Sequence, residues 1–189
     1  MRNSFRLIAV VLAVVIGVAG CGSDRSGGPK GDPTTIVATA PDRTLAAGTA
    51  KVAVATANSV ATGTIDFGTG AARMHVTPAT ATEPELTNPV VAIDIVRAVA
   101  SVDPYGGAEV RGASTIKYEL DIAPGEELTA KLGGGLRGPT FYADVYVDSQ
   151  LRIRRVTLPV DLNERRPSDT HQILAKLITI DFYDFGSAS

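Results

Sequence analysis

The sequence predicts an α+β protein in which a long helix covers one apolar face of an antiparallel sheet. Several stretches alternate apolar and polar residues with a period of two, which is typical of strands that bury one face. One stretch, residues 88–102, instead spaces its apolar residues for one face of an amphipathic helix. The chain of 189 residues is long enough for a single domain with a substantial core.

Before residue 80 the sequence predicts a short helix and three strands. The helix covers residues 41–48, beginning near Asp42 and ending at Gly48. The strands cover residues 50–57, 63–68 and 72–78. Because the strands are short and Gly or Pro residues separate them, we expect a β-meander.

The strongest helix pattern covers residues 88–102. Asn88 can cap this helix, and Pro89 suits its first turn. The apolar residues that share one helix face are Val91, Ala92, Ile95, Val96 and Val99. That face must pack against an apolar surface, and the predicted strands supply one.

Strand patterns return after residue 113. Further strands are predicted at residues 114–122, 141–148, 151–160 and 176–186, with a helical turn at 124–132. The inward positions of three of these strands are Ile116, Tyr118, Leu120, Ile122, Phe141, Ala143, Val145, Val147, Ile178, Ile180 and Phe182. Asp144 and Asp148 are expected to face outward. The apolar phase slips along 151–160, which predicts a β-bulge near Arg154 and Arg155.

The first 24 residues have the parts of an export signal. Arg2 and Arg6 form a positive segment, residues 7–18 form an apolar core, and small residues precede Cys21, the chain's only cysteine. An apolar core of about 12 residues is shorter than the roughly 20 that a membrane-spanning helix needs. The sequence therefore predicts a cleaved leader rather than a membrane span.

Residues 18–21, Val-Ala-Gly-Cys, resemble the bacterial lipobox. In that motif the cysteine sulfur carries a diacylglycerol, and the chain is cut just before the cysteine. The resemblance implies that Cys21 anchors the protein, because two acyl chains hold a protein at a membrane where one binds only marginally. The alternative is an ordinary secreted protein with an unrelated cysteine near its cleavage site.

These features predict three segments. Residues 1–20 are the lipoprotein signal peptide, residues 21–34 are the lipidated cysteine with a flexible linker, and residues 35–189 are a single domain. Removal of Arg2 and Arg6 changes the formal net charge from −2 to −4. An acidic domain argues against nucleic acid as a partner and against a polybasic contact with lipid. We expect an anchor in the cell membrane, with the domain on its extracytoplasmic face.

No pattern of catalytic, cofactor-binding or metal-binding residues stands out. Residues 133–138 match G-x-G-x-x-G, but Pro139 and a predicted strand follow where a dinucleotide site needs a helix. His75 and His171 are the only histidines and have no acidic ligands beside them. Asp-Phe-Gly at 184–186 lacks the other kinase motifs. We expect no enzyme activity, no cofactor and no metal.

One basic cluster has two interpretations. Its members are Arg152, Arg154, Arg155, Arg165 and Arg166, and the neighbouring acids are Asp148 and Asp161. The first interpretation is solvated pairing across strands. The second is docking of an anionic lipid headgroup.

Three stretches of the second half resemble actinobacterial lipoproteins of the LprG/LppX type. They read NPVVAIDIVRAVASVDPYGGAEVRGASTIKYELDI, FYADVYVDSQLRIRRVTLPVD and ITIDFYDFG, within residues 88–186. The resemblance implies a LolA-like half-barrel, in which a curved antiparallel sheet carries a long helix on its concave face. Some members of this family hold acyl chains or glycolipids between sheet and helix.

The sequence departs from that family at two places. Leu151 stands where the family's hairpin usually has Gly, and only residues 79–87 separate two elements between which longer relatives have another pair of strands. A smaller sheet would enclose less volume. The residues that would line a cavity are Val91, Ile95, Val96, Val99, Ile116, Tyr118, Val145 and Val147. Each of them suits an ordinary core equally well.

The resemblance implies a membrane-anchored envelope lipoprotein that binds or carries a lipid or glycolipid in an apolar cavity. The alternative is a lipid-anchored scaffold or interaction module whose core is filled and holds no ligand.

Overall fold

A computed structural model of the chain describes residues 27–56, 59–77, 88–132, 139–159 and 177–187. The strands are β1 Thr49–Ala55, β2 Val60–Asp66, β3 Ala71–Thr77, β4 Val99–Val110, β5 Ala113–Ile122, β6 Phe141–Asp148, β7 Ile153–Pro159 and β8 Leu177–Tyr183. The helices are α1 Pro33–Leu45, α2 Val90–Arg97 and α3 Glu126–Lys131. Within the described ranges, no helix has the length and apolar character that crossing a membrane requires.

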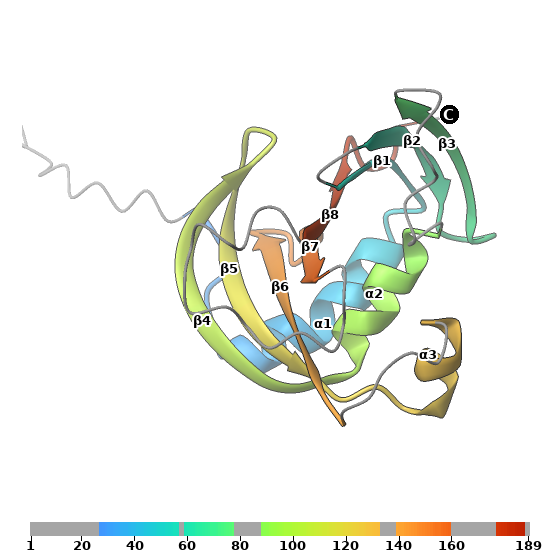
Figure 1. The fold of residues 1–189 in the computed structure, drawn as a ribbon. Coiled ribbons are helices and arrows are strands. Elements are labelled where there is room, and N and C mark those ends of the chain that lie inside the picture. Colours follow the sequence, from blue (N-terminus) through green and yellow to red (C-terminus); the bar gives the residue numbers. More distant parts are fainter. Residues whose placement is uncertain (1–26, 57–58, 78–87, 133–138, 160–176, 188–189) are drawn as a thin grey trace, which may run out of the picture.

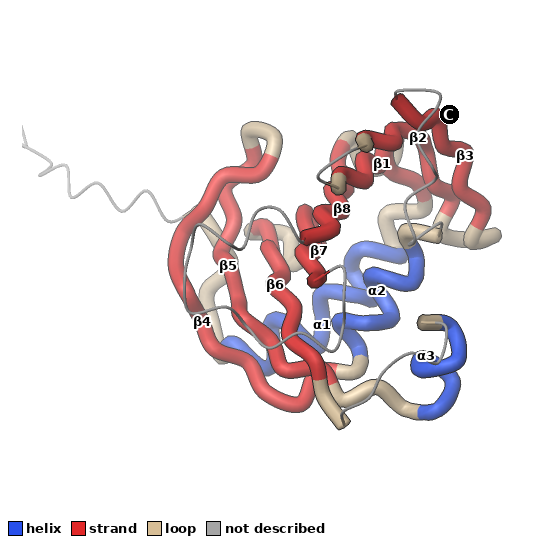
Figure 2. Tube along the Cα trace, viewed as in Figure 1, coloured by secondary structure: helices blue, strands red, loops and turns tan. Residues whose placement is uncertain are grey.

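The eight strands form one sheet in the order β3-β2-β1-β8-β7-β6-β5-β4. Every pair of neighbouring strands is antiparallel. The sheet is curved and not closed, and it bends around α1 and α2 (Figure 1). Figure 2 shows the helices gathered together, with the strands passing beside and above them. The predicted α+β half-barrel is confirmed.

Strand β8 joins the two halves of the sheet, although it comes last in the chain. Its Phe182 lies opposite Val52 of β1, and its Ile180 lies opposite Val156 of β7. These side chains all point to the face that carries the helices, which we call the inner face. Because successive side chains of a strand alternate between faces, the polar residues of each strand lie on the other side, the outer face. The predicted inward positions of the three strands are all buried or half-buried.

Helix α1 is the longest helix among the described residues and the main correction to the predicted elements. The predicted helix at 41–48 is wrong in its start, because α1 begins at Pro33 and runs through Pro41. Asp32 caps it, since its carboxylate accepts hydrogen bonds from the Thr35 N–H and hydroxyl, both at 2.8 Å. The buried Thr44 hydroxyl accepts a hydrogen bond of 2.8 Å from the N–H of Ile153. That bond fixes the last turn of α1 to the start of β7.

Helix α2 is shorter than predicted, because it ends at Arg97 and β4 begins at Val99. The predicted cap is displaced by one residue, because Pro89 takes the N-cap position, but the Asn88 side chain still accepts a hydrogen bond of 3.0 Å from the N–H of Val90. Val99 continues the 3.6-residue pattern, but it pairs with Ile122 of β5 and is held in a strand. Pairing within the sheet therefore overrides helical periodicity at this point.

Strand β4 was not predicted, because its sequence carries Pro104 and two glycines. These residues are tolerated because β4 is the edge strand of the sheet. On its unpaired side, the missing N–H of proline removes no hydrogen bond between strands. The pairing with β5 shifts register between Val99 and Ser101 and again between Pro104 and Gly106. Such irregularities also discourage pairing with a foreign strand.

The predicted bulge in β7 is confirmed. Tyr146 of β6 pairs with Arg155, whereas the next residue, Val147, pairs with Ile153, so Arg154 is the extra residue. The turn before β7 holds Leu151 at a φ of 61°. This left-handed conformation favours glycine, the residue that the LprG/LppX-type pattern usually has at this position, so the leucine is strained here.

Gly63 in β2 is required by a close backbone approach. A Cβ at this position would lie 1.8 Å from the carbonyl oxygen of Arg73 in β3. We expect Gly63→Ala to lower the free energy of unfolding by about 1–3 kcal/mol, because β2 and β3 must move apart. Gly107→Ala in β4 is the matched control, since a Cβ there meets nothing within 4 Å. Equal losses for the two variants in urea unfolding would contradict this explanation.

Candidate functional site

The eight residues predicted to line a cavity all lie on the inner side of the fold, but to different depths. The fully buried ones, between 0% and 2% exposed, are Ile95, Val96, Tyr118, Val145 and Val147. The half-buried ones are Val91, Val99 and Ile116. Burial raises the pKa of the Tyr118 hydroxyl, which keeps it neutral.

These residues form two groups. On β5 and β6, Ile116 lies opposite Val147 and Tyr118 lies opposite Val145. Helix α1 packs on β4, β6 and β7, whereas α2 packs on α1, α3 and β7. The helix that covers β6 is therefore α1, which the sequence did not place there. Ile116 is covered by Gly28, where a Cβ would come within 2.3 Å of the Ile116 side chain.

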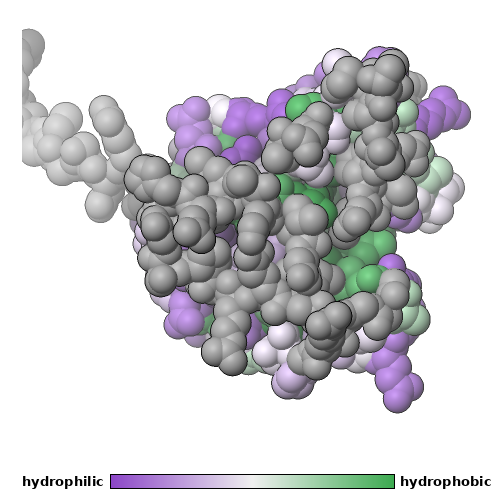
Figure 3. Space-filling model, in the orientation of Figure 1, coloured by the Kyte–Doolittle hydropathy of each residue, from purple (hydrophilic) through white to green (hydrophobic). Residues whose placement is uncertain are grey.

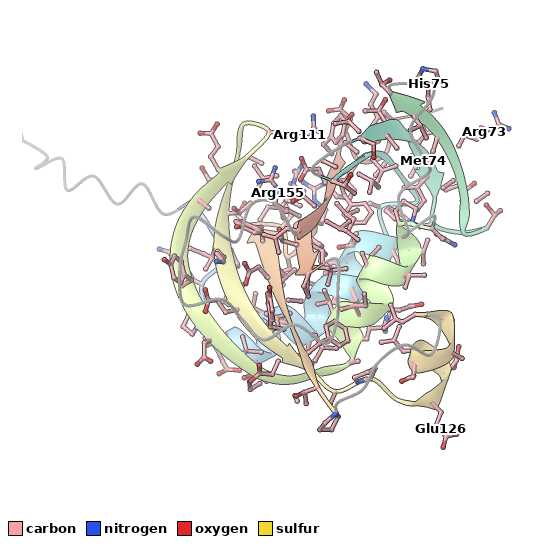
Figure 4. All side chains as sticks on the ribbon, in the orientation of Figure 1. Arg73, Met74, His75, Arg111, Glu126 and Arg155 are labelled. Carbon is pink, nitrogen blue, oxygen red and sulfur yellow. The ribbon has the colours of Figure 1, made fainter. Side chains whose placement is uncertain are left out.

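A second apolar surface lies on the inner side of β3, which the sequence did not single out. Ala72, Met74 and Val76 point inward and are half-buried, while Arg73 and His75 point outward and are exposed. Figure 4 shows Arg73 directed away from the fold and Met74 on the opposite side of the strand. The signal was present in the alternation of residues 71–77, because an edge strand with alternating large apolar residues needs an apolar partner.

The start of α2 adds to this apolar surface. Val90 and Val91 are half-buried, and both pack against the core. Figure 3 shows apolar surface over α2, at the centre right of the view. The inner side of the fold thus combines a closely packed region with apolar side chains that the described residues cover only in part.

The outer face carries an ion-pair network around Asp148. The Asp148 carboxylate accepts hydrogen bonds from the N–H groups of Gln150 and Arg152, from the Arg152 guanidinium at 3.0 and 3.1 Å, and from Nε of Arg154 at 2.6 Å. Asp148 lies on the predicted outward side of β6, but the expectation that it faces solvent is wrong, because it is 4% exposed. The neighbouring arginines cover it.

A second network joins the β4–β5 hairpin to β8. Nε and Nη2 of Arg155 donate to Asp181 at 2.6 and 3.0 Å, and Nε of Arg111 donates to the same carboxylate at 2.9 Å. The guanidinium of Arg111 also lies 4.3 Å from the ring centre of Tyr183. The hydrogen bonds that Arg155 donates to Asp181 raise the pKa of Arg155, so its guanidinium stays charged at neutral pH.

The predicted basic cluster is thus partly confirmed and partly changed. Arg152, Arg154 and Arg155 pair with carboxylates, but the partner of Arg155 is Asp181. Sequence reasoning missed Arg111 and Asp181, because one lies in a hairpin turn and the other on a different strand. Arg165, Arg166 and Asp161 lie outside the described residues. We call Arg111, Arg152, Arg154 and Arg155 the arginine cluster.

Several predicted features cannot be placed on the fold. Cys21, His171 and the G-x-G-x-x-G segment at 133–138 lie outside the described residues. His75 is exposed on the outer side of β3. In the part of the chain that the structure describes, no three His, Cys, Asp or Glu side chains come together as metal ligands would.

The network predicts how stability depends on pH. Burial raises the pKa of Asp148, but hydrogen bonds from Arg152 and Arg154 outweigh it and leave the pKa below its ordinary value. The ionised carboxylate therefore stabilises the fold fully at neutral pH. This contribution is lost as the pH falls below about 4, from the ordinary pKa toward the lower pKa of the folded state.

Urea unfolding from neutral pH down to about pH 3 tests this dependence. We expect the stability of the wild-type protein to decline more steeply below about pH 4 than that of Asp148→Asn, which has no carboxylate at this position. Parallel pH profiles for the two proteins would show that the Asp148 pKa is not depressed in the folded state.

Comparison with known proteins supports the fold. No family model matches the sequence, and no curated protein matches it. The structure is similar to LprF from Mycobacterium bovis, with a TM-score of 0.49 and 13% identity over 86% of this chain and 97% of that one. It is also similar to the lipoprotein LppX from Mycobacterium tuberculosis, with a TM-score of 0.50 and 12% identity over 84% of this chain and 98% of that one. The likeness to LppX supports the fold that the resemblance to LprG/LppX-type lipoproteins implied.

Proposed function

We propose that the protein is a lipoprotein of the cell envelope, held on the extracytoplasmic face of the membrane by a diacylglyceryl group on Cys21. We further propose that it acts as a binding protein, not an enzyme, and that its ligand is a lipid or glycolipid whose acyl chain lies on the inner side of the sheet. The leader pattern supports the anchor. The fold shared with LppX, itself a lipoprotein, supports the same class.

The observation that carries the proposed ligand is the apolar inner surface of β3. Met74 and Val76 are half-buried there, and Val91 of α2 is half-buried on the same inner side of the fold. Branched and thioether side chains provide the flexible apolar contact that an acyl chain needs. Of the residues predicted to line a cavity, we assign Val91 to this surface. The remaining seven residues would lie behind this surface, in the core, or at the edge of the surface.

The anchor is tested by the substitution Cys21→Ala. We expect the wild-type protein to be extracted only with detergent and to carry the mass of a diacylglycerol at residue 21. The variant should leave the membrane fraction or accumulate as an uncut precursor, because the modified sulfur is the site of both attachment and processing. Unchanged extraction and unchanged mass would contradict the anchor.

The ligand is tested by native mass spectrometry of the protein purified from a lipid-producing host. We expect a bound mass in the lipid range in the wild-type protein. Met74→Glu should lose it, because the substitution places a charge on the apolar surface. His75→Glu is the matched control, since the same charge then points outward from the same strand. Ligand-free wild-type protein, or equal loss in both variants, would contradict the proposed surface.

A second candidate function is a lipid-anchored scaffold with a filled core. It is favoured by the complete burial of Ile95 and Val96 of α2 and of Val145 and Val147 of β6, each 0% exposed. This function predicts ligand-free protein from every host. It also predicts that Met74→Glu and the wild-type protein are both free of bound lipid and differ only in stability.

A further inference from the structure

The arginine cluster concentrates positive charge in a chain that is acidic overall. Its four guanidinium groups surround only two carboxylates, Asp148 and Asp181, so each carboxylate is shared by two arginines. The four guanidinium groups and the two carboxylates together carry a net formal charge of +2. Arg111, with 41% of its side chain exposed, presents part of this charge to the surroundings.

The arginines lie at one end of the sheet. Arg111 is in the turn between β4 and β5, and Arg152 follows the turn between β6 and β7. These turns are neighbours, because Thr115 near the start of β5 lies opposite Asp148 at the end of β6. Figure 4 shows Arg111 and Arg155 close to each other near the centre of the view, and Arg73 at its right edge.

The described chain begins at this same end. A Cβ on Gly27 would lie 3.1 Å from the Cβ of Ser114, and Gly28 packs on Ile116, so the chain is seated against the start of β5. Figure 1 shows that the first described residues lie beside β4 and β5. Gly27 and Gly28 belong to the segment expected to be a flexible linker, and both lie against the start of β5.

This contact shortens the tether. Only six residue steps separate Cys21 from Gly27, and a fully extended chain of that length spans at most about 20 Å. An anchored Cys21 therefore holds the start of β5, and the two turns beside it, within about two nanometres of the lipid surface. A longer tether would have left every face of the domain equally able to approach the membrane.

We propose that the domain docks on anionic lipid through the arginine cluster, with the β4–β5 and β6–β7 turns facing the membrane. The proposal rests on the proposed anchor at Cys21 and adds an orientation to it. The tether supplies proximity, and the charge of the cluster selects which side of the domain faces the bilayer. The net negative charge of the chain keeps the remaining surface away from anionic lipid.

The proposal is tested on the full-length, lipid-modified protein in vesicles. Because acylation occupies Cys21, a single introduced cysteine takes a fluorophore specifically. Ser149→Cys labels the β6–β7 turn, and Glu127→Cys labels α3; both positions are exposed. Energy transfer to an acceptor in the lipid headgroups is compared between phosphatidylcholine vesicles and vesicles that also contain phosphatidylglycerol.

We expect the transfer from residue 149 to be roughly twofold higher on the anionic vesicles, and this difference to disappear at about 1 M salt, where the Debye length is about 3 Å. Arg111→Gln with Arg154→Gln should abolish the difference, while Asp181 keeps Arg155 and Asp148 keeps Arg152 as partners. Arg111→Lys with Arg154→Lys should retain it. Arg73→Gln with Lys131→Gln removes the same charge elsewhere and should also retain it.

The two possible failures are distinguishable. A mass spectrum with a bare thiol at Cys21 would overturn the anchor, and the docking orientation with it. A lipid-modified protein whose residue-149 transfer is equal on both kinds of vesicle, or whose residue-127 label responds more strongly, would overturn the docking surface and leave the anchor intact. Loss of the difference in the Arg73 and Lys131 variant would also overturn it, since total charge would then be the cause.

Discussion

Replacing Asp148 with alanine is expected to lower the free energy of unfolding by about 3 kcal/mol. The carboxylate is 4% exposed and binds the guanidinium groups of Arg152 and Arg154 together with two backbone N–H groups. Alanine leaves these donors without an acceptor and leaves two half-buried cations without a counter-ion. Both arginines reach water in part, which places the loss at the lower end of the range for a broken buried ion pair.

Chemical denaturation with urea measures this loss. Asp103→Ala is the matched control, because Asp103 is exposed on the edge strand β4, and we expect it to change stability by less than about 0.5 kcal/mol. Asp148→Asn should fall between the two, since the amide oxygen still accepts from the N–H of Arg152. A loss below about 1 kcal/mol for Asp148→Ala would contradict this expectation. It would mean that water solvates Arg152 and Arg154 as well as the carboxylate does.

The strands could be predicted wherever one face of the sheet is buried and the other is polar. In β5 and β6 the alternation of Tyr118 and Val145 with charged neighbours identifies both the strand and its inner face. The bulge at Arg154 was visible for the same reason, because one extra residue reverses the alternation of everything after it. Such predictions need only local sequence, since burial imposes the pattern along each strand.

The edge of the sheet and the first helix could not be predicted in the same way. Strand β4 forms because Val99 and Val102 find partners on β5, and that pairing cannot be seen in a sequence that contains Pro104. Helix α1 begins inside a stretch of Gly, Pro and charge. Its one local signal was the Asp32-Pro33 pair, a capping residue followed by a proline suited to the first helical position.

The candidate site shows the same division. The spacing of the inner residues predicted that they are buried. It did not predict which helix covers them, because both α1 and α2 pack on the same apolar face of the sheet. The partners of the arginine cluster are set by the strand order, which places β8 beside β7 and brings Asp181 to Arg155. Net charge likewise concealed a local excess of positive charge at one end of the sheet.

Phe182→Ala is expected to have the largest effect on stability, a loss of about 3–5 kcal/mol. Phe182 is 0% exposed in β8, the strand that joins the two halves of the sheet, and its ring centre lies 6.2 Å from that of Phe67. Removing the ring takes away apolar contacts with β1 and leaves a cavity. The cavity cannot collapse, because β8 is held by backbone hydrogen bonds to β1 and β7 on its two sides. Tyr105→Ala is the matched aromatic control, because Tyr105 is 72% exposed.

The size of this loss also tests the scaffold with a filled core. A large loss with an unchanged dependence on urea concentration shows that the inner face is closely packed around Phe182, so any acyl chain must lie farther out, on the surface of Met74 and Val76. A loss near that of Tyr105→Ala would show instead that the ring borders space that is already open. The scaffold with a filled core would then be excluded, because a filled core cannot lose the ring of a fully buried phenylalanine without a large loss of stability.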